Sequence, residues 1–303
     1  MSSLGPVAFY GKIAAEADFV RINAGAFQRA GWDAWFQQGI AELQRLRLGL
    51  PSEPVCFVLS GGQGRVCVGA FAPGRDAIER AFPAVVFIEE PASNANSFAS
   101  WLHGLRSFFA RASELARDAV NLTPRDLAAR LVSVVSRTQD LSPDLDAHQI
   151  LATSSLIHLM EEKSTADAAY ALTTAICACD HARAARADGG QRAPALGLCA
   201  VTEIQRLFWI TLACRHMGGG LPSVFWSPPK GAFLLSLAPP AHSALVHLAA
   251  PGHPHPWVWP LETSNRTALA QAISKLSPAQ AHVLSTPETS LLHILSAFSK
   301  ESR

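Results

Sequence analysis

The sequence predicts a mixed α/β protein of the α+β type, in which an antiparallel sheet is flanked by helices. Segments with apolar residues at three- and four-residue steps, typical of helices, alternate with short runs of β-branched and aromatic residues, typical of strands. In addition, 49% of the 303 residues are hydrophobic and only 16% are charged. This composition provides apolar material for sizeable cores and excludes a disordered chain.

The N-terminal part follows a strand, helix, meander, helix order. The apolar run 7–10 predicts a first strand, and residues 32–46 place apolar side chains along one helical face, with Gly49 at the position of a left-handed C-terminal cap. An antiparallel meander is expected from three runs of strand-like composition, 55–59, 66–71 and 84–88. A single amphipathic helix over 98–115 is expected to close this part against its sheet.

The remainder of the chain is mostly helical in pattern. Residues 123–187 read as a helical layer that begins with Thr123 as N-cap and a proline at the first helical position. After a helix over about 201–215, two strand candidates form a small second sheet, and helical spacing resumes from 266 to 298. The two candidate strands are 223–226 and 232–237.

The length of the chain predicts two domains. The turn-prone segment 140–144 is the predicted boundary, which gives an N-terminal α/β domain at 1–140 and a helical and small α/β domain at 145–303.

Charge and hydropathy exclude several classes of partner. The formal net charge of +1 gives no basic field for nucleic acid. No segment has the roughly 20 uninterrupted apolar residues that a bilayer crossing needs, and the first residues do not resemble a signal peptide. We therefore expect a cytoplasmic protein that does not insert into the membrane.

No motif predicts a catalytic or metal site. Residues 60–64 lack the Gly-Lys-Ser/Thr ending of a phosphate loop and favour a hairpin loop. Cys177, Cys179 and His181 favour a helix with buried thiols, because Cys179 points away from the other two. The histidines of 253–256 favour a loop, with metal binding as an open alternative. We expect no cofactor and no small-molecule ligand.

Three blocks near the N-terminus occur in the order and spacing of a known family. They are Phe9-Tyr10-Gly11-Lys12-Ile13, Asp18-Phe19-Val20-Arg21 and Trp32-Asp33-Ala34-Trp35-Phe36. A fourth stretch follows, from residue 68 through Asp76 to Arg80-Ala81-Phe82-Pro83. These blocks resemble the TagF family, also called ImpM, over roughly residues 6–90. Ala14 and Ala17 depart from the family's usual proline and glycine.

The resemblance implies a longin-like N-terminal domain and a post-translational repressor of a bacterial type VI secretion system. It implies action through protein–protein interaction with the forkhead-associated scaffold protein, without catalysis. The family-motif positions, which are the candidate partner-binding residues, are Tyr10, Gly11, Lys12, Asp18, Phe19, Arg21, Trp32, Asp33, Trp35, Arg80, Phe82 and Pro83.

Two alternatives to the repressor remain open: a hydrolase with its site between the two domains, and a structural adaptor of the secretion apparatus. The aromatic motif residues are expected to be core residues. The charged ones either pair with one another or face a partner, and the sequence does not decide between these roles.

Overall fold

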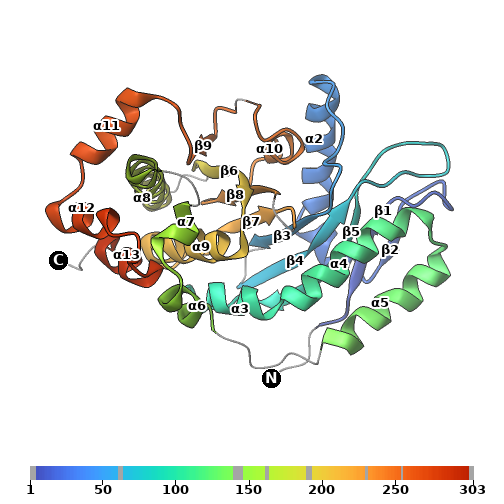
Figure 1. Ribbon diagram of the computed structural model, residues 1–303. Helices are drawn as coiled ribbons and strands as arrows, with labels where there is room; N and C mark the ends of the chain where they lie inside the picture. Colours follow the sequence, from blue (N-terminus) through green and yellow to red (C-terminus); the bar gives the residue numbers. More distant parts are fainter. Residues whose placement is uncertain are drawn as a thin grey trace.

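One sheet runs through the whole molecule. A computed structural model describes residues 5–60, 64–138, 146–160, 164–188, 193–228, 231–253 and 255–299. Its described strands form a nine-stranded sheet in the order β2-β1-β5-β4-β3-β7-β8-β6-β9, flanked by helices (Figure 1). The predicted mixed α/β class, with an antiparallel sheet flanked by helices, is confirmed.

The N-terminal half has the predicted strand, helix, meander, helix order, with one further strand, β2, that was not predicted. Its strands pair antiparallel throughout. They are β1 (Ala8–Gly11), β2 (Val20–Ile22), β3 (Val55–Ser60), β4 (Arg65–Ala72) and β5 (Ala84–Pro91). The predicted hairpin loop at 60–64 falls mostly on 61–63, which lie outside the described residues.

The C-terminal strands continue the same sheet instead of forming a separate one, because β7 pairs antiparallel with β3. They are β6 (Ala195–Val201), β7 (Ser223–Trp226), β8 (Gly231–Ser236) and β9 (Val258–Pro260). Strands β6 and β9, which pair in parallel, were also not predicted from the sequence. The division into 1–140 and 145–303 stays a prediction, and its boundary lies outside the described residues.

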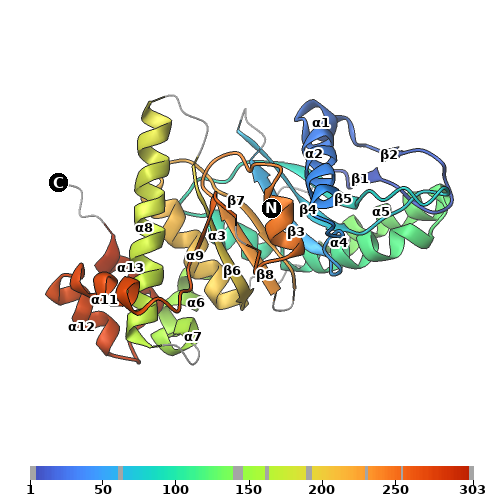
Figure 2. The same ribbon diagram turned by 90° about the horizontal axis from the view of Figure 1, so that it is seen from above.

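Helices cover both faces of the sheet. Three short or medium helices lie on one face (Figures 1 and 2): α1 (Gly25–Arg29), α2 (Trp32–Arg45) and α10 (Ala244–Ala249). The opposite face is covered by α3 (Phe98–Gly104), α4 (Arg106–Asp118), the short turn η1 (Ala119–Asn121), α5 (Pro124–Thr138) and α9 (Glu203–His216).

The remaining helices form the end of the molecule distant from β1 and β2, as Figure 2 shows. The long helix α8 (Thr165–Ala187) lies against α9, and α11 and α12 pack on α8. The others are α6 (Ala147–Thr153), α7 (Leu156–Met160), α11 (Arg266–Ser274), α12 (Pro278–Ser285) and α13 (Leu291–Phe298).

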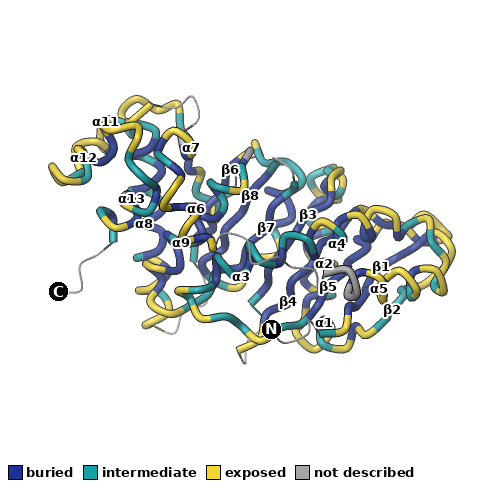
Figure 3. Tube along the Cα trace, turned by 60° about the horizontal axis from the view of Figure 1, so that its bottom comes forward, coloured by how far each residue is buried: buried dark blue, intermediate teal, exposed yellow. Residues whose placement is uncertain are grey.

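Alternate residues of each central strand enter two separate hydrophobic cores. In β3, Cys56 and Val58 belong to the core beneath α4 and α9, whereas Phe57 and Leu59 belong to the core beneath α2 and α10. Successive side chains of a strand point to opposite faces, so a strand covered on both faces needs a continuous apolar run. The central strands are accordingly buried in Figure 3, whereas the edge strands β2 and β9 are partly exposed.

Two local expectations are wrong. Gly49 is not the left-handed cap of α2; Arg47 takes that conformation, with φ of 57°, and Leu48 N–H donates to the carbonyl of Leu43. The predicted single helix over 98–115 is two helices, because Leu105 leaves the helical conformation after the weak helix former Gly104.

Trp35 of α2 joins the two halves of the chain. Its ring stacks on Phe225 of β7 with centroids 5.7 Å apart, and its indole N–H donates to the carbonyl of Pro240 at 2.8 Å. Nearby, Gly39 lets α2 approach α10 closely, since a Cβ there would lie 2.9 Å from the carbonyl oxygen of His242. This contact makes α2 part of both halves.

We predict that Trp35→Ala lowers the free energy of unfolding by about 3–5 kcal/mol, because it removes a buried aromatic ring and leaves the Pro240 carbonyl without its donor. Chemical denaturation of the full chain measures this. Trp257→Ala is the matched control, because Trp257 is 45% exposed and its removal should change stability little. Equal losses of unfolding free energy in the two variants would contradict the role of Trp35 in joining the two halves of the chain.

Candidate functional site

Asp76 is the centre of the family-motif residues. Its side chain is fully buried in the loop between β4 and β5, and its Oδ2 lies 2.9 Å from Lys12 Nζ and 2.7 Å from Arg80 Nε. Its Oδ1 accepts from the backbone N–H groups of Ile78 and Arg80, at 3.1 and 2.9 Å. A carboxylate with this many donors is a structural anion that fixes the loop.

Arg80 connects this loop to the segment that follows β1. Its Nη2 donates to the carbonyl of Ala17 at 2.6 Å, and Ala77 N–H donates to the carbonyl of Glu16 at 2.9 Å. Lys12 is buried, whereas the Arg80 side chain stays about half exposed. The charged motif residues Lys12 and Arg80 therefore pair through Asp76.

An aromatic cluster lies next to this charge cluster. Tyr10 stacks on Phe19 with ring centroids 5.3 Å apart, and Phe82 packs edge-on against both rings. Cations flank the half-buried Phe19: Lys12 Nζ lies 5.2 Å and the Arg21 guanidinium carbon 5.8 Å from its ring centroid. The expectation that aromatic motif residues belong to the core is correct for Tyr10 and Phe82, which are buried.

The other motif residues have different roles. Trp32 and Trp35 are buried in the core beneath α2. Gly11 is needed for close approach within the sheet, not for a turn, because a Cβ would lie 2.3 Å from the carbonyl oxygen of the buried Pro83. Asp33 lies in the first turn of α2, where a negative charge is favourable.

We use the name motif surface for five of the side chains in this region that reach solvent. The half-buried ring of Phe19 is surrounded by charges, and Ile78 on the neighbouring loop is an apolar side chain that is 62% exposed. Its members are Asp18, Phe19, Arg21, Ile78 and Arg80. Exposed apolar groups beside charged side chains are typical of protein-binding surfaces.

Asp76 was named only as part of the fourth motif stretch and not as a candidate site residue, and Ile78 was not named at all. Asp76 is distant in sequence from Lys12, so no local spacing connects the two residues. The signal that could have found it is the run Asp76 to Arg80, an acidic residue four positions before a basic one in a loop rich in turn formers.

The pKa of Asp76 reflects these contacts. Burial acts to raise the pKa of this carboxyl, but hydrogen bonds from Lys12, from Arg80 and from the Ile78 backbone outweigh burial and hold the pKa well below its ordinary value. Nearby, burial and the negative charge of Asp33 raise the pKa of Tyr10. The site is thus built around one buried carboxylate that is ionised at neutral pH.

We predict that Asp76→Asn lowers the thermal midpoint by several degrees at neutral pH. A folded-state pKa below the unfolded value of about 3.9 stabilises the protein above that pH and loses its effect as the pH falls. The difference in thermal midpoint between the wild type and Asp76→Asn should therefore become smaller as the pH falls from about 5 towards 2. Thermal unfolding across this range measures it.

Glu79→Gln is the control for Asp76→Asn, because Glu79 forms an exposed ion pair with Arg75. Its replacement should leave the thermal midpoint almost unchanged. A difference between wild type and Asp76→Asn that stays constant or widens in acid would contradict the ionised, stabilising role of Asp76.

The described residues contain no group of three or more potential metal ligands. The expectation of buried thiols on α8 is correct for Cys179 and wrong for Cys177, which is exposed. No helix in the described ranges has the length and hydrophobicity that a membrane crossing requires.

Comparison with known proteins places the motif surface within a known domain. Residues 8–134 match the TagF N-terminal domain, described as type VI secretion system-associated. Among solved structures, the crystal structure of PA0076 from Pseudomonas aeruginosa PAO1 is 22% identical, with a TM-score of 0.44; the match covers 82% of this chain and 96% of that chain. No curated protein matches the chain. The domain match includes the whole motif surface.

Proposed function

We propose that this chain, which belongs to the TagF family through its N-terminal domain at residues 8–134, is a cytoplasmic post-translational repressor of a type VI secretion system. Its proposed partner is the forkhead-associated scaffold protein of that apparatus, which the chain holds inactive by direct contact. The domain's association with type VI secretion is the observation that carries this proposal.

The motif surface is the proposed contact region. The buried motif residues build the domain core, but Asp18, Arg21 and Arg80 keep their charged groups at the surface. Hydrogen bonds join the loops at 14–19 and 73–83, which carry Asp18 and Arg80, and Arg21 lies on strand β2. A surface that is already ordered before binding loses little conformational entropy when a partner docks.

We place the activity in binding and not in catalysis. Asp76 is the most strongly perturbed carboxylate of this region, yet its oxygens already accept four hydrogen bonds or ion pairs and its pKa is lowered. A general base needs a free lone pair and a pKa near the working pH. Asp76 therefore suits a structural role in positioning the motif surface.

The test is secretion of the tube protein from cells that lack this chain or overproduce it. We expect deletion to raise secretion and overproduction to silence it. Overproduction of the double variant Arg21→Glu/Ile78→Asp should restore secretion at least about tenfold, since charge reversal and an exposed carboxylate at the interface remove the binding energy.

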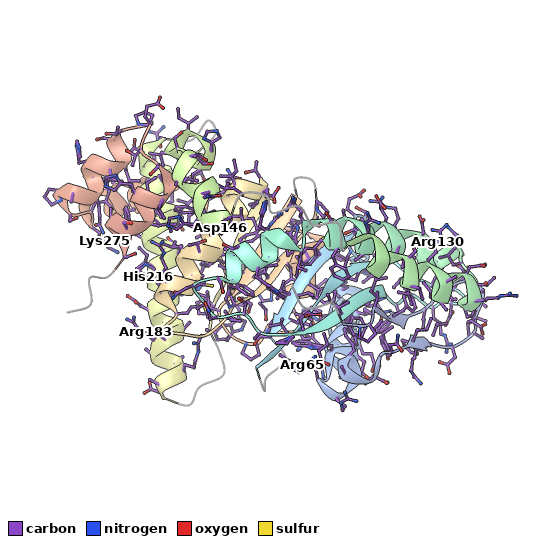
Figure 4. The ribbon with its side chains drawn as sticks, turned by 90° about the horizontal axis from the view of Figure 1, so that it is seen from below. Arg65, Arg130, Asp146, Arg183, His216 and Lys275 are labelled. Atoms are coloured by element: carbon purple, nitrogen blue, oxygen red, sulfur yellow. The ribbon has the colours of Figure 1, made fainter. Side chains whose placement is uncertain are left out.

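The matched control is Arg130→Glu/Val132→Asp, which makes the same kinds of change on two exposed residues of α5. Figure 4 labels Arg130 on this helix, at the opposite end of the molecule from His216 of α9. This control should repress like the wild type. Loss of secretion on deletion would indicate an adaptor instead of a repressor, and full repression by the motif-surface variant would contradict the proposed contact region.

A further inference from the structure

A cavity of about 240 Å³ lies at the junction of the two halves of the chain. Its walls come from β3, α3 and α4 on one side and from α9 and β7 on the other. Phe109, Leu207 and Trp226 supply apolar walls, and Arg206, His103 and Glu203 supply polar ones. This site is separate from the motif surface and from the proposed scaffold contact.

Arg206 is the unusual group in this cavity. Its side chain is only 16% exposed and its guanidinium carbon lies 4.6 Å from the ring centroid of Trp226, in a cation–π contact. Within the described residues, no acceptor receives a hydrogen bond from its guanidinium. The nearest carboxylate oxygen belongs to Glu203 and lies 3.9 Å from Arg206 Nη2, beyond hydrogen-bond distance.

Glu203 is already engaged elsewhere. The same Oε1 atom lies 2.8 Å from Nδ1 of His103, so this residue does not satisfy the guanidinium. The Arg206 guanidinium is mostly shielded from solvent, which carries a desolvation cost and lowers the pKa of Arg206. An anion in the cavity would remove that cost.

Charge and size define the class of anion. Arg206 brings a positive charge to the cavity, and the nearest carboxylate, that of Glu203, is hydrogen-bonded to His103. The planar fork of a guanidinium matches a carboxylate with two parallel hydrogen bonds. The cavity is smaller than the roughly 300–1,000 Å³ of sites for drug-sized ligands, so it suits a small molecule.

We propose that this cavity binds a small organic monocarboxylate, whose carboxylate accepts hydrogen bonds from Arg206 while its apolar body contacts Phe109, Leu207 and Trp226. This departs from the sequence-based expectation of no small-molecule ligand. Because the walls come from both halves of the chain, an occupied cavity would also stabilise the junction between them.

The experiment is a calorimetric titration of the full chain with benzoate, with acetate and inorganic phosphate as separate probes. We expect benzoate to bind at one site per chain, more tightly than acetate because its ring contacts the apolar walls. Arg206→Gln should weaken benzoate binding at least about tenfold, and should abolish the rise in thermal midpoint that benzoate produces in the wild type.

Arg117→Gln is the matched control, since Arg117 lies on α4 in an exposed pair with Glu53 and should leave benzoate binding unchanged. Arg206→Lys serves if Arg206→Gln does not fold; it keeps the charge but loses the fork, and should still weaken binding.

Absence of benzoate binding at millimolar concentration would overturn the proposal. Benzoate affinity that is equal in wild type and in the Arg206 variants would also overturn it. Tighter binding of phosphate than of benzoate would overturn the assignment to a monocarboxylate.

Discussion

Strand β3 pairs with β4 on one side and with β7 on the other, and the rest of the molecule depends on this double pairing. The strand is covered on both faces, so it contributes side chains to both hydrophobic cores. Trp35 reinforces the junction on one face by stacking on Phe225, and Trp226 contributes to the opposite face beside Phe109. The proposed carboxylate cavity lies at this same junction, where the two halves together supply its walls.

The family motif combines two physical tasks. Tyr10, Phe82 and the tryptophans are buried and specify the domain core, and Gly11 permits β1 to approach Pro83. The charged positions instead organise the surface: buried Asp76 binds Lys12 and Arg80, and Arg80 holds the neighbouring loop through Ala17. One buried carboxylate thus determines where the exposed motif side chains lie.

Much of the fold could be predicted because its signals are local. The meander strands are runs of β-branched and aromatic residues, and Thr123 with Pro124 marks the start of α5. Strand β6 was missed because its sequence, Ala195 to Val201, is rich in small residues that favour no single structure; pairing with β8 and β9 makes it a strand. The Asp76 cluster and the Arg206 cavity combine residues distant in sequence, which no spacing rule connects.

Calorimetric titration of the purified full chain with the purified forkhead-associated scaffold protein tests most directly whether the motif surface is the regulatory contact. We expect a direct complex that Arg21→Glu/Ile78→Asp weakens at least about tenfold and that Arg130→Glu/Val132→Asp leaves unchanged, because contact residues central to an interface supply most of its binding energy. No complex, or a complex with equal affinity for both variants, would contradict the assignment of the motif surface as the regulatory contact.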